Sequence, residues 1–143
     1  MNSIGRALPT RAGEAVLRKI RILLVSSPAL SEVIRYLFDA QPRFEVVGSL
    51  RNLKGLAEQA GRLLPELIVV NVKPVRTGVC PVVVAIKQSS PSSKIILICA
   101  VSSLTSDARK CGADACLDQE QLVRRLVPTA SAVSARLPRF ASG

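Results

Sequence analysis

The side chains that most often carry out chemistry in proteins are scarce in this chain. It has no histidine, and its four cysteines (Cys80, Cys99, Cys111 and Cys116) show no C-x-x-C spacing, so we expect no metal site. Buried, reduced thiols are the simpler interpretation. The sequence also lacks a glycine-rich phosphate loop and an acid–base constellation. It therefore predicts a protein that is not an enzyme and needs no cofactor.

Length and composition indicate one domain. The chain has 143 residues and 48% apolar content, which is enough for a single core. Only 3% of its residues are aromatic, so the core must consist of aliphatic side chains, which suits a parallel sheet covered on both faces. No apolar run approaches the roughly 18 residues of a membrane span. Residues 1–19 also lack the apolar stretch of a signal peptide, so we expect a cytoplasmic protein.

Short apolar runs alternate with helical patterns, which predicts repeated βα units. The expected strands are residues 20–25, 44–48, 67–72, 94–100 and 114–117. The expected helices lie near residues 30–38, 56–64, 79–88 and 103–110, and from residue 119 onward. The last helix should bury Leu122, Val123 and Leu126, and Pro128 should kink or interrupt it. Right-handed crossovers between these units give a doubly wound, flavodoxin-like α/β fold, a five-stranded parallel sheet in the order 2-1-3-4-5.

Several short motifs extend this prediction to a family. They are Ile-Arg-Ile-Leu-Leu-Val-Ser-Ser-Pro at 20–28, Phe-Glu-Val-Val-Gly at 44–48, Ile-Ile-Leu-Ile at 95–98 and Gly-Ala-Asp at 112–114. With them, the chain resembles a bacterial response-regulator receiver domain, and residues 45–48 are similar to receivers of LuxR-type regulators. The resemblance implies a basic N-terminal extension at 1–19, a receiver-like domain at 20–135 and a C-terminal tail at 136–143.

The resemblance also locates a degenerate phosphorylation pocket. Receivers have an acidic pair after strand 1, an Asp after strand 3, a Ser or Thr after strand 4 and a Lys after strand 5. The matching residues here are Ser26 and Ser27, Asn71, Cys99, and Gln119 or its neighbour Asp118. Mg²⁺ binds through carboxylate oxygens, which the serines lack, and an amide is no phosphate acceptor. We expect neither phosphorylation nor Mg²⁺ binding, and instead hydrogen bonds of Ser26, Ser27, Asn71 and Gln119 to each other or to loop backbone.

Two cysteines occupy the positions through which receivers couple phosphorylation to their surface. The resemblance implies a hydroxyl residue on strand 4 and an aromatic residue on strand 5, where this chain has Cys99 and Cys116. Neighbouring thiols suggest a redox switch as one hypothesis. Because no activating base is visible in the sequence, two small buried apolar side chains are the favoured interpretation.

The leading functional hypothesis is a stand-alone pseudo-receiver, an adaptor or scaffold in signalling that works without phosphorylation. The resemblance implies that it binds a protein partner, or a second copy of itself, through the fourth helix, fifth strand and fifth helix. The sequence itself shows only that Arg124 and Arg125 are exposed early in the fifth helix. No DNA-reading helix-turn-helix is expected after that helix.

The alternative is binding to an anionic surface, either nucleic acid or lipid headgroups. Of the net charge of +10, residues 1–21 and 119–143 carry most, and both ends should emerge at the same pole of the fold. This basic pole comprises Arg6, Arg11, Arg18, Lys19, Arg21, Arg136 and Arg139. No aromatic platform accompanies the charge, which makes nucleic acid the less favoured partner.

Overall fold

The computed structural model describes residues 19–72, 80–99 and 112–135. Within them, five parallel strands form one sheet in the order β2-β1-β3-β4-β5, which confirms the predicted fold class and strand order. The strands are β1 (Ile20–Val25), β2 (Phe44–Leu50), β3 (Leu67–Val72), β4 (Lys94–Cys99) and β5 (Ala115–Asp118). The predicted bounds hold for β1 and β3. Strand β2 ends two residues later than expected, and β5 lies one residue further along the chain.

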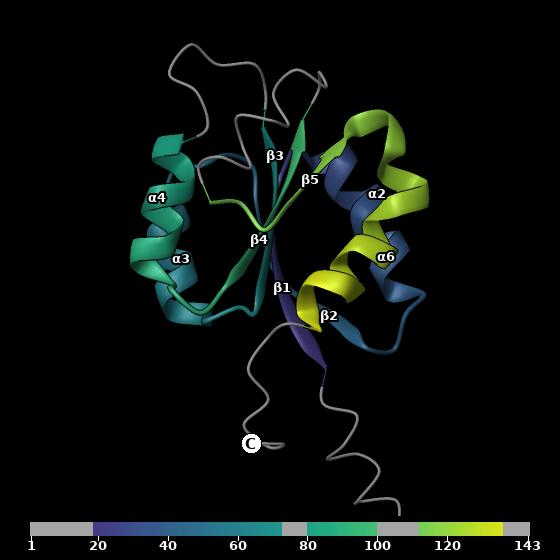
Figure 1. Ribbon diagram of the computed structural model, residues 1–143, viewed down its shortest axis with the longest axis horizontal. Coiled ribbons are helices and arrows are strands. Elements are labelled where there is room, and N and C mark those ends of the chain that lie inside the picture. The colour runs from purple at the N-terminus through teal and green to yellow at the C-terminus, as the bar shows by residue number, and fades with distance from the viewer. Residues whose placement is uncertain (1–18, 73–79, 100–111, 136–143) are drawn as a thin grey trace, which may run out of the picture.

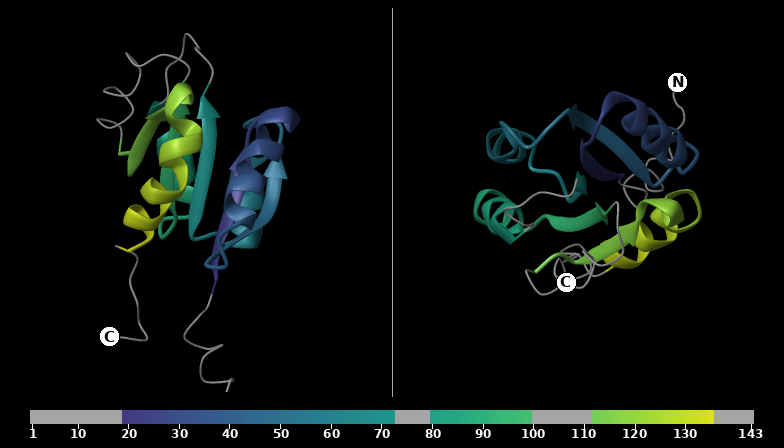
Figure 2. Two further views of the ribbon diagram at one scale, coloured as in Figure 1. Left: turned by 90° about the vertical axis from the view of Figure 1, so that its right-hand side faces the viewer. Right: turned by 90° about the horizontal axis from the view of Figure 1, so that it is seen from above.

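Helices cover both faces of the sheet. They are α2 (Pro28–Asp39), α3 (Leu56–Leu63), α4 (Cys80–Ser89) and α6 (Leu122–Ser134), and a short 3₁₀ helix, η1 (Gln119–Gln121), precedes α6. Helices α2 and α6 lie on one face, and α3 and α4 lie on the other (Figures 1 and 2). The expected helix at 103–110 falls outside the described residues.

Two apolar layers form where the helices meet the sheet. Successive strand side chains point to opposite faces, so Ile22 and Leu24 of β1 join the layer under α2 and α6, and Leu23 and Val25 join the layer under α3 and α4. Ile22, Leu23 and Leu24 are fully buried. Burying each such side chain stabilises the fold by about 1.5–3 kcal/mol, which is why these runs pair as strands rather than remain exposed.

Helix α6 differs from the sequence prediction at two positions. Leu122 and Leu126 are buried as expected, but Val123 is 65% exposed because it lies about 100° further round the helix. Pro128 does not interrupt the helix, which continues to Ser134. Pro128 lies on the exposed side, so the hydrogen bond lost with its missing N–H leaves no acceptor in the core.

Candidate functional site

The residues of the predicted pocket gather at the carboxyl ends of the strands, at the top of Figure 1. Ser26 and Ser27 directly follow β1, and Asn71 lies at the end of β3. The pairing of β4 with β5 sets Cys99 opposite Asp118. Gln119, the first residue of η1, is exposed. The fold thus brings four of the five predicted pocket positions to the sheet edge and leaves Gln119 facing solvent.

The serines that replace the acidic pair have structural partners. Ser26 is 5% exposed, and its Oγ lies 2.5 Å from the Oγ of Ser31 on α2 and donates to the carbonyl of Ser27 at 3.2 Å. Ser49 of β2 in turn donates to Ser31 at 3.3 Å. Ser27 is the N-cap of α2, and its Oγ accepts from the N–H of Leu30 at 3.3 Å. These hydroxyls therefore tie β1 to α2 and β2, through Ser31 and Ser49, which were not among the predicted partners.

Two buried side-chain oxygens at the same edge lack hydrogen-bond partners. The Oδ1 atoms of Asn71 and Asp118 are buried and accept no hydrogen bond within the described part of the chain. The expected bonding of Asn71 to the other pocket residues is therefore wrong for this oxygen. Strand alternation also separates Asn71, which follows Val69 on the α2–α6 face, from Cys99, which belongs to the layer on the α3–α4 face.

Cys99 is a buried thiol in an unreactive setting. Burial, and then the negative charge of Asp118, raises the pKa of the Cys99 thiol, so it stays protonated at neutral pH. Cys116 pairs with Leu97 rather than with Cys99. This offset of two residues separates the two Cα atoms by about 8 Å, beyond the reach of a disulfide. The register disfavours a redox pair and leaves one buried thiol, Cys99, and one half-buried thiol, Cys116.

Metal-binding and membrane-spanning features are absent from the described ranges. Residues 19–72, 80–99 and 112–135 contain no group of three His, Cys, Asp or Glu side chains placed to hold a metal ion. Among the helices of these ranges, none has both the length and the apolar character to cross a membrane.

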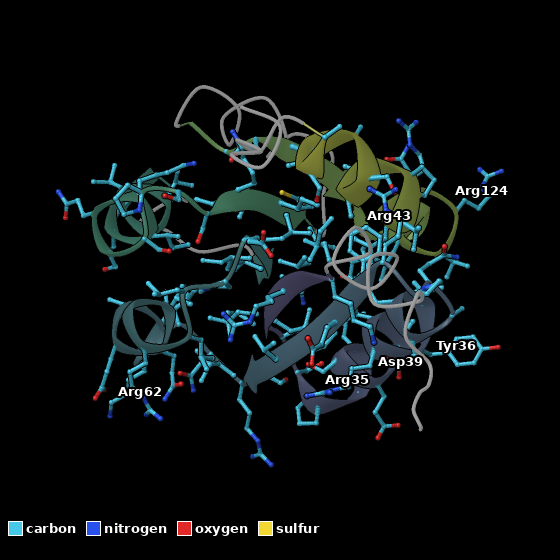
Figure 3. All side chains as sticks on the ribbon, turned by 90° about the horizontal axis from the view of Figure 1, so that it is seen from below. Arg35, Tyr36, Asp39, Arg43, Arg62 and Arg124 are labelled. Atoms are coloured by element: carbon cyan, nitrogen blue, oxygen red, sulfur yellow. The ribbon has the colours of Figure 1, made fainter. Side chains whose placement is uncertain are left out.

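Arg124 and Arg125 are both exposed, but they lie on different sides of α6. Figure 3 shows Arg124 pointing outward on the same side of the molecule as Tyr36 of α2. Adjacent helical residues are about 100° apart, so Arg125 is turned away from α2, towards β5. Of the two predicted contact residues, only Arg125 therefore points to the side of α6 where β5 lies. The expected helix at 103–110, which should form part of the partner face, lies outside the described residues.

The predicted basic pole is only partly within the described residues. Strand β1 begins and α6 ends at the same end of the molecule, as expected (Figure 1). Lys19 is exposed there, but Nη1 of Arg21 donates to the carbonyl of Leu63 at 2.6 Å, at the end of α3. Arg21 is therefore a structural residue rather than a free surface cation. The other members, Arg6, Arg11, Arg18, Arg136 and Arg139, lie outside the described residues.

Two exposed cations at this end were missed by the sequence prediction. Figure 3 views the molecule from this end and shows Arg43, which directly precedes β2, and Arg62, in the last turn of α3. Both side chains are exposed. The sequence contained a signal for both. Residues just before a strand lie at this edge of the sheet, and so do residues at the end of a helix that runs antiparallel to the strands.

Comparisons with known proteins support the fold. No protein-family model matches the chain, and no curated protein sequence does. Among solved structures, the receiver domain of the response regulator NarL from Mycobacterium tuberculosis superposes with a TM-score of 0.72 at 16% identity, over 83% of this chain and 98% of that one. A LuxR-family response regulator from Aurantimonas sp. SI85-9A1 gives 0.73 at 21% identity, over 87% and 94% of the two chains.

A third structure agrees with these two. The response regulator domain of Thermotoga maritima CheB gives a TM-score of 0.72 at 20% identity, over 85% of this chain and all of that domain. The chain thus has the receiver-domain fold that its motifs predicted. At these identities the likeness concerns the fold, and the function has to be argued from the site.

Proposed function

We propose that this chain is a pseudo-receiver, a cytoplasmic adaptor that binds a protein partner without being phosphorylated. The observation that carries the proposal is the bonding of the Ser26 and Ser27 hydroxyls, which join the end of β1 to the first turns of α2. They occupy the positions where a receiver needs metal-binding carboxylates, and neither can supply the charge that Mg²⁺ requires.

The remaining pocket chemistry points the same way. Asn71 has an amide in place of the phosphate acceptor, and an amide is not a nucleophile towards a phosphoryl donor. Cys99 keeps its proton, and Asp118 adds a negative charge near the place where a receiver has a lysine. A phosphoryl group would meet repulsion rather than stabilisation beside this carboxylate. The surface, rather than the pocket, is therefore the functional part of the proposal.

Phosphorylation is tested directly by mass. The full chain is incubated with a small-molecule phosphodonor and Mg²⁺, beside an active receiver domain as the positive control. We expect an unchanged intact mass for this chain and an added phosphate on the control. A stoichiometric, acid-labile phosphate on this chain would overturn the proposal.

Partner binding is tested by capture from the native host. Arg125 lies on the β5 side of α6, and Arg62 is an equally exposed arginine at the end of α3. We expect wild type and Arg62→Glu to retain a stoichiometric protein and Arg125→Glu to lose it. Removal of residues 1–17 should have little effect. Retention of the same protein by Arg125→Glu would contradict the proposed contact surface.

The anionic-surface alternative is favoured by one observation, the group of exposed cations where β1 begins. Lys19, Arg43 and Arg62 lie at that end, and the chain enters β1 and leaves α6 there. If this surface binds nucleic acid, affinity should fall steeply with salt, and Arg43→Glu with Arg62→Glu should reduce it. Binding that is insensitive to salt would exclude this alternative.

A further inference from the structure

Leu64, at the end of α3, combines two features that are unfavourable in water. Its side chain is 64% exposed, and its backbone, with a φ of 49° and a ψ of 56°, lies in the left-handed region. Within residues 19–72, 80–99 and 112–135, it is the only residue other than glycine with a positive φ. Glycine or asparagine would adopt this conformation with less strain and would expose less apolar surface.

The bonds that hold Leu64 in place use its backbone. Its N–H donates to the carbonyl of Ala60 at 2.9 Å, which closes the last turn of α3. Its carbonyl accepts from Nη1 of Arg21 at 3.5 Å, and the same nitrogen donates to the carbonyl of Leu63 at 2.6 Å. Glycine or asparagine in its place would keep these bonds. The strain and exposure of the leucine therefore point to a contact outside the chain.

Leu64 lies at the basic end of the molecule. Because α3 runs antiparallel to the strands, its last residues lie where β1 begins, beside Arg21. Three cations are exposed at this end: Lys19 directly before β1, Arg43 directly before β2, and Arg62 in the last turn of α3. Figure 3 views the molecule from this end and shows Arg43 and Arg62. The exposed leucine is thus accompanied by positive charge.

This end stays positive when its acidic groups are included. Among the described residues, two exposed carboxylates lie here, on Asp39 at the end of α2 and on Glu45, the second residue of β2. The chain also enters β1 and leaves α6 at this end, and residues 1–18 and 136–143 contain five arginines against one glutamate. An anionic partner is therefore attracted to the end as a whole.

An apolar side chain among cations fits a lipid bilayer better than a nucleic acid. Single strands stack on exposed aromatic rings, but Phe44, the aromatic residue next to Arg43, is only 4% exposed. Duplex phosphates attract cations but offer nothing to a leucine. At a bilayer, an apolar side chain enters the boundary between headgroups and acyl chains, while cations stay at the anionic headgroups.

We propose that the end of the molecule where β1 begins docks on an anionic phospholipid bilayer. Leu64 inserts below the headgroups, and Lys19, Arg43 and Arg62 lie among them. This inference rests on the anionic-surface alternative of the proposed function and names its partner. Arg125 lies near the start of α6, towards the opposite end, so a protein partner bound there would be held at the membrane.

The first test measures cosedimentation of the full chain with vesicles of phosphatidylcholine mixed with phosphatidylglycerol, and with vesicles of phosphatidylcholine alone. We expect binding to the mixed vesicles only. Leu64→Asn should weaken this binding by about tenfold, because the inserted apolar area is lost. Leu64→Gly, which also suits the left-handed backbone, should give a similar loss. The matched control is Leu53→Asn, since Leu53 is 42% exposed beyond the end of β2, at the opposite end of the sheet, and should bind as wild type does.

Thermal unfolding of the same variants separates a contact role from a structural one. Leu64→Asn should keep or raise the melting temperature, since asparagine adopts the left-handed conformation with less strain. A lower melting temperature together with lost binding in both Leu64 variants would assign the side chain to the fold and overturn the proposal. Folded Leu64 variants that bind the mixed vesicles as wild type does would also overturn it, as would a wild type that does not bind them.

The second test separates lipid from nucleic acid. Arg43→Gln with Arg62→Gln should weaken binding to the mixed vesicles by about twentyfold, because two cations leave the headgroups. If a duplex DNA fragment binds and responds to this change while vesicle binding does not, the anionic-surface alternative stands and the lipid proposal is overturned. Loss of both kinds of binding in wild type would remove the alternative itself. Leu64→Asn should capture the same protein partner as wild type, which tests the adaptor proposal separately.

Discussion

Buried polar groups are bonded differently at the edge of the sheet where the strands begin and at the edge where they end. At the edge where β4 begins, the Asp114 carboxylate accepts from the N–H of Ile95 at 2.8 Å and from Nζ of Lys87 at 3.2 Å. At the opposite edge, Asn71 and Asp118 each have a buried oxygen that accepts nothing within the described residues. The first arrangement stabilises the fold, whereas an unpaired buried acceptor costs about 1–3 kcal/mol.

A second set of hydrogen bonds at the edge where β4 begins strengthens the contrast. Ser93 is fully buried, and its Oγ donates to the carbonyl of Pro65 at 2.5 Å and lies 2.6 Å from the Oγ of Ser90. These bonds join the ends of α3 and α4 to the start of β4. We infer that polar side chains at this edge stabilise the fold, whereas the buried Oδ1 atoms of Asn71 and Asp118 at the pocket edge do not. Four changes can sharpen or break this comparison.

The largest effect is expected from restoring an acidic residue at the pocket edge. Ser26→Asp should lower the free energy of unfolding by about 3 kcal/mol at pH 7, since burial disfavours the charged form by roughly two pKa units. The folded-state pKa of this carboxyl would lie above its unfolded value. The loss should therefore be small near pH 4 and grow as pH rises towards the folded pKa.

Its control is the adjacent serine. Ser27→Asp should change stability by less than about 0.5 kcal/mol, because Asp caps a helix as well as Ser does. Urea denaturation at two pH values measures both variants. Equal losses for the two would show that burial at position 26 is not the cause.

Asp114→Ala should lower the free energy of unfolding by about 2 kcal/mol, because it leaves the Ile95 N–H without its acceptor and removes one of the two acceptors of the Lys87 ammonium. Asp39→Ala also removes a carboxylate, but at an exposed position on α2, and should leave the free energy of unfolding nearly unchanged. Thermal or chemical denaturation checks the pair. A neutral Asp114→Ala would remove the distinction between the two edges.

Asn71→Leu should be neutral or stabilise the fold by up to about 1 kcal/mol, because it replaces an unpaired acceptor with an apolar group of similar shape. Ser93→Ala, which removes a bonded hydroxyl at the other edge, should instead cost about 1–2 kcal/mol. Urea denaturation of both variants should show changes in the free energy of unfolding that differ in sign or clearly in size. A larger loss for Asn71→Leu would reverse the comparison.

The smallest effect concerns Cys99. Its folded-state pKa is raised, so the unfolded chain loses the thiol proton first, and stability should fall as pH rises from about 8.5 towards the folded pKa. Cys99→Ala should remove this part of the pH dependence under reducing conditions. Asp118→Asn should reduce it, because the negative charge contributes to the shift. Parallel curves for wild type and Cys99→Ala would contradict the assignment.

Sequence patterns predicted the strands well and the helix surfaces less well. The apolar runs of β1 and β3 have the period and length of strands buried on both faces, so their bounds were recoverable. Val123 was expected to be buried, yet it faces solvent beside the buried Leu122. Leu64 was expected within a helix, yet it is the exposed C-cap of α3 in the left-handed conformation. Apolar type alone does not reveal where a helix leaves the core.

The pocket was predictable in composition but not in arrangement. The motifs named Asn71 and Cys99, and the period of two already placed them on opposite faces of the sheet, an inference that the sequence prediction did not draw. The contact of Arg21 with the Leu63 carbonyl was not recoverable, because it depends on where α3 ends relative to β1. Whether a buried oxygen such as Asn71 Oδ1 finds a donor likewise depends on the tertiary packing.

The strand order also has a consequence for synthesis. Strand β1 is made first and lies inside the sheet, whereas α6, the last described helix, closes the layer beside α2. At about 5–20 residues per second, α6 leaves the ribosome on the order of ten seconds after β1. Until then Leu24, Val69 and Ile98 lack the cover that α6 provides. Each new molecule thus exposes the β1 part of this apolar layer from early in synthesis until α6 has been made.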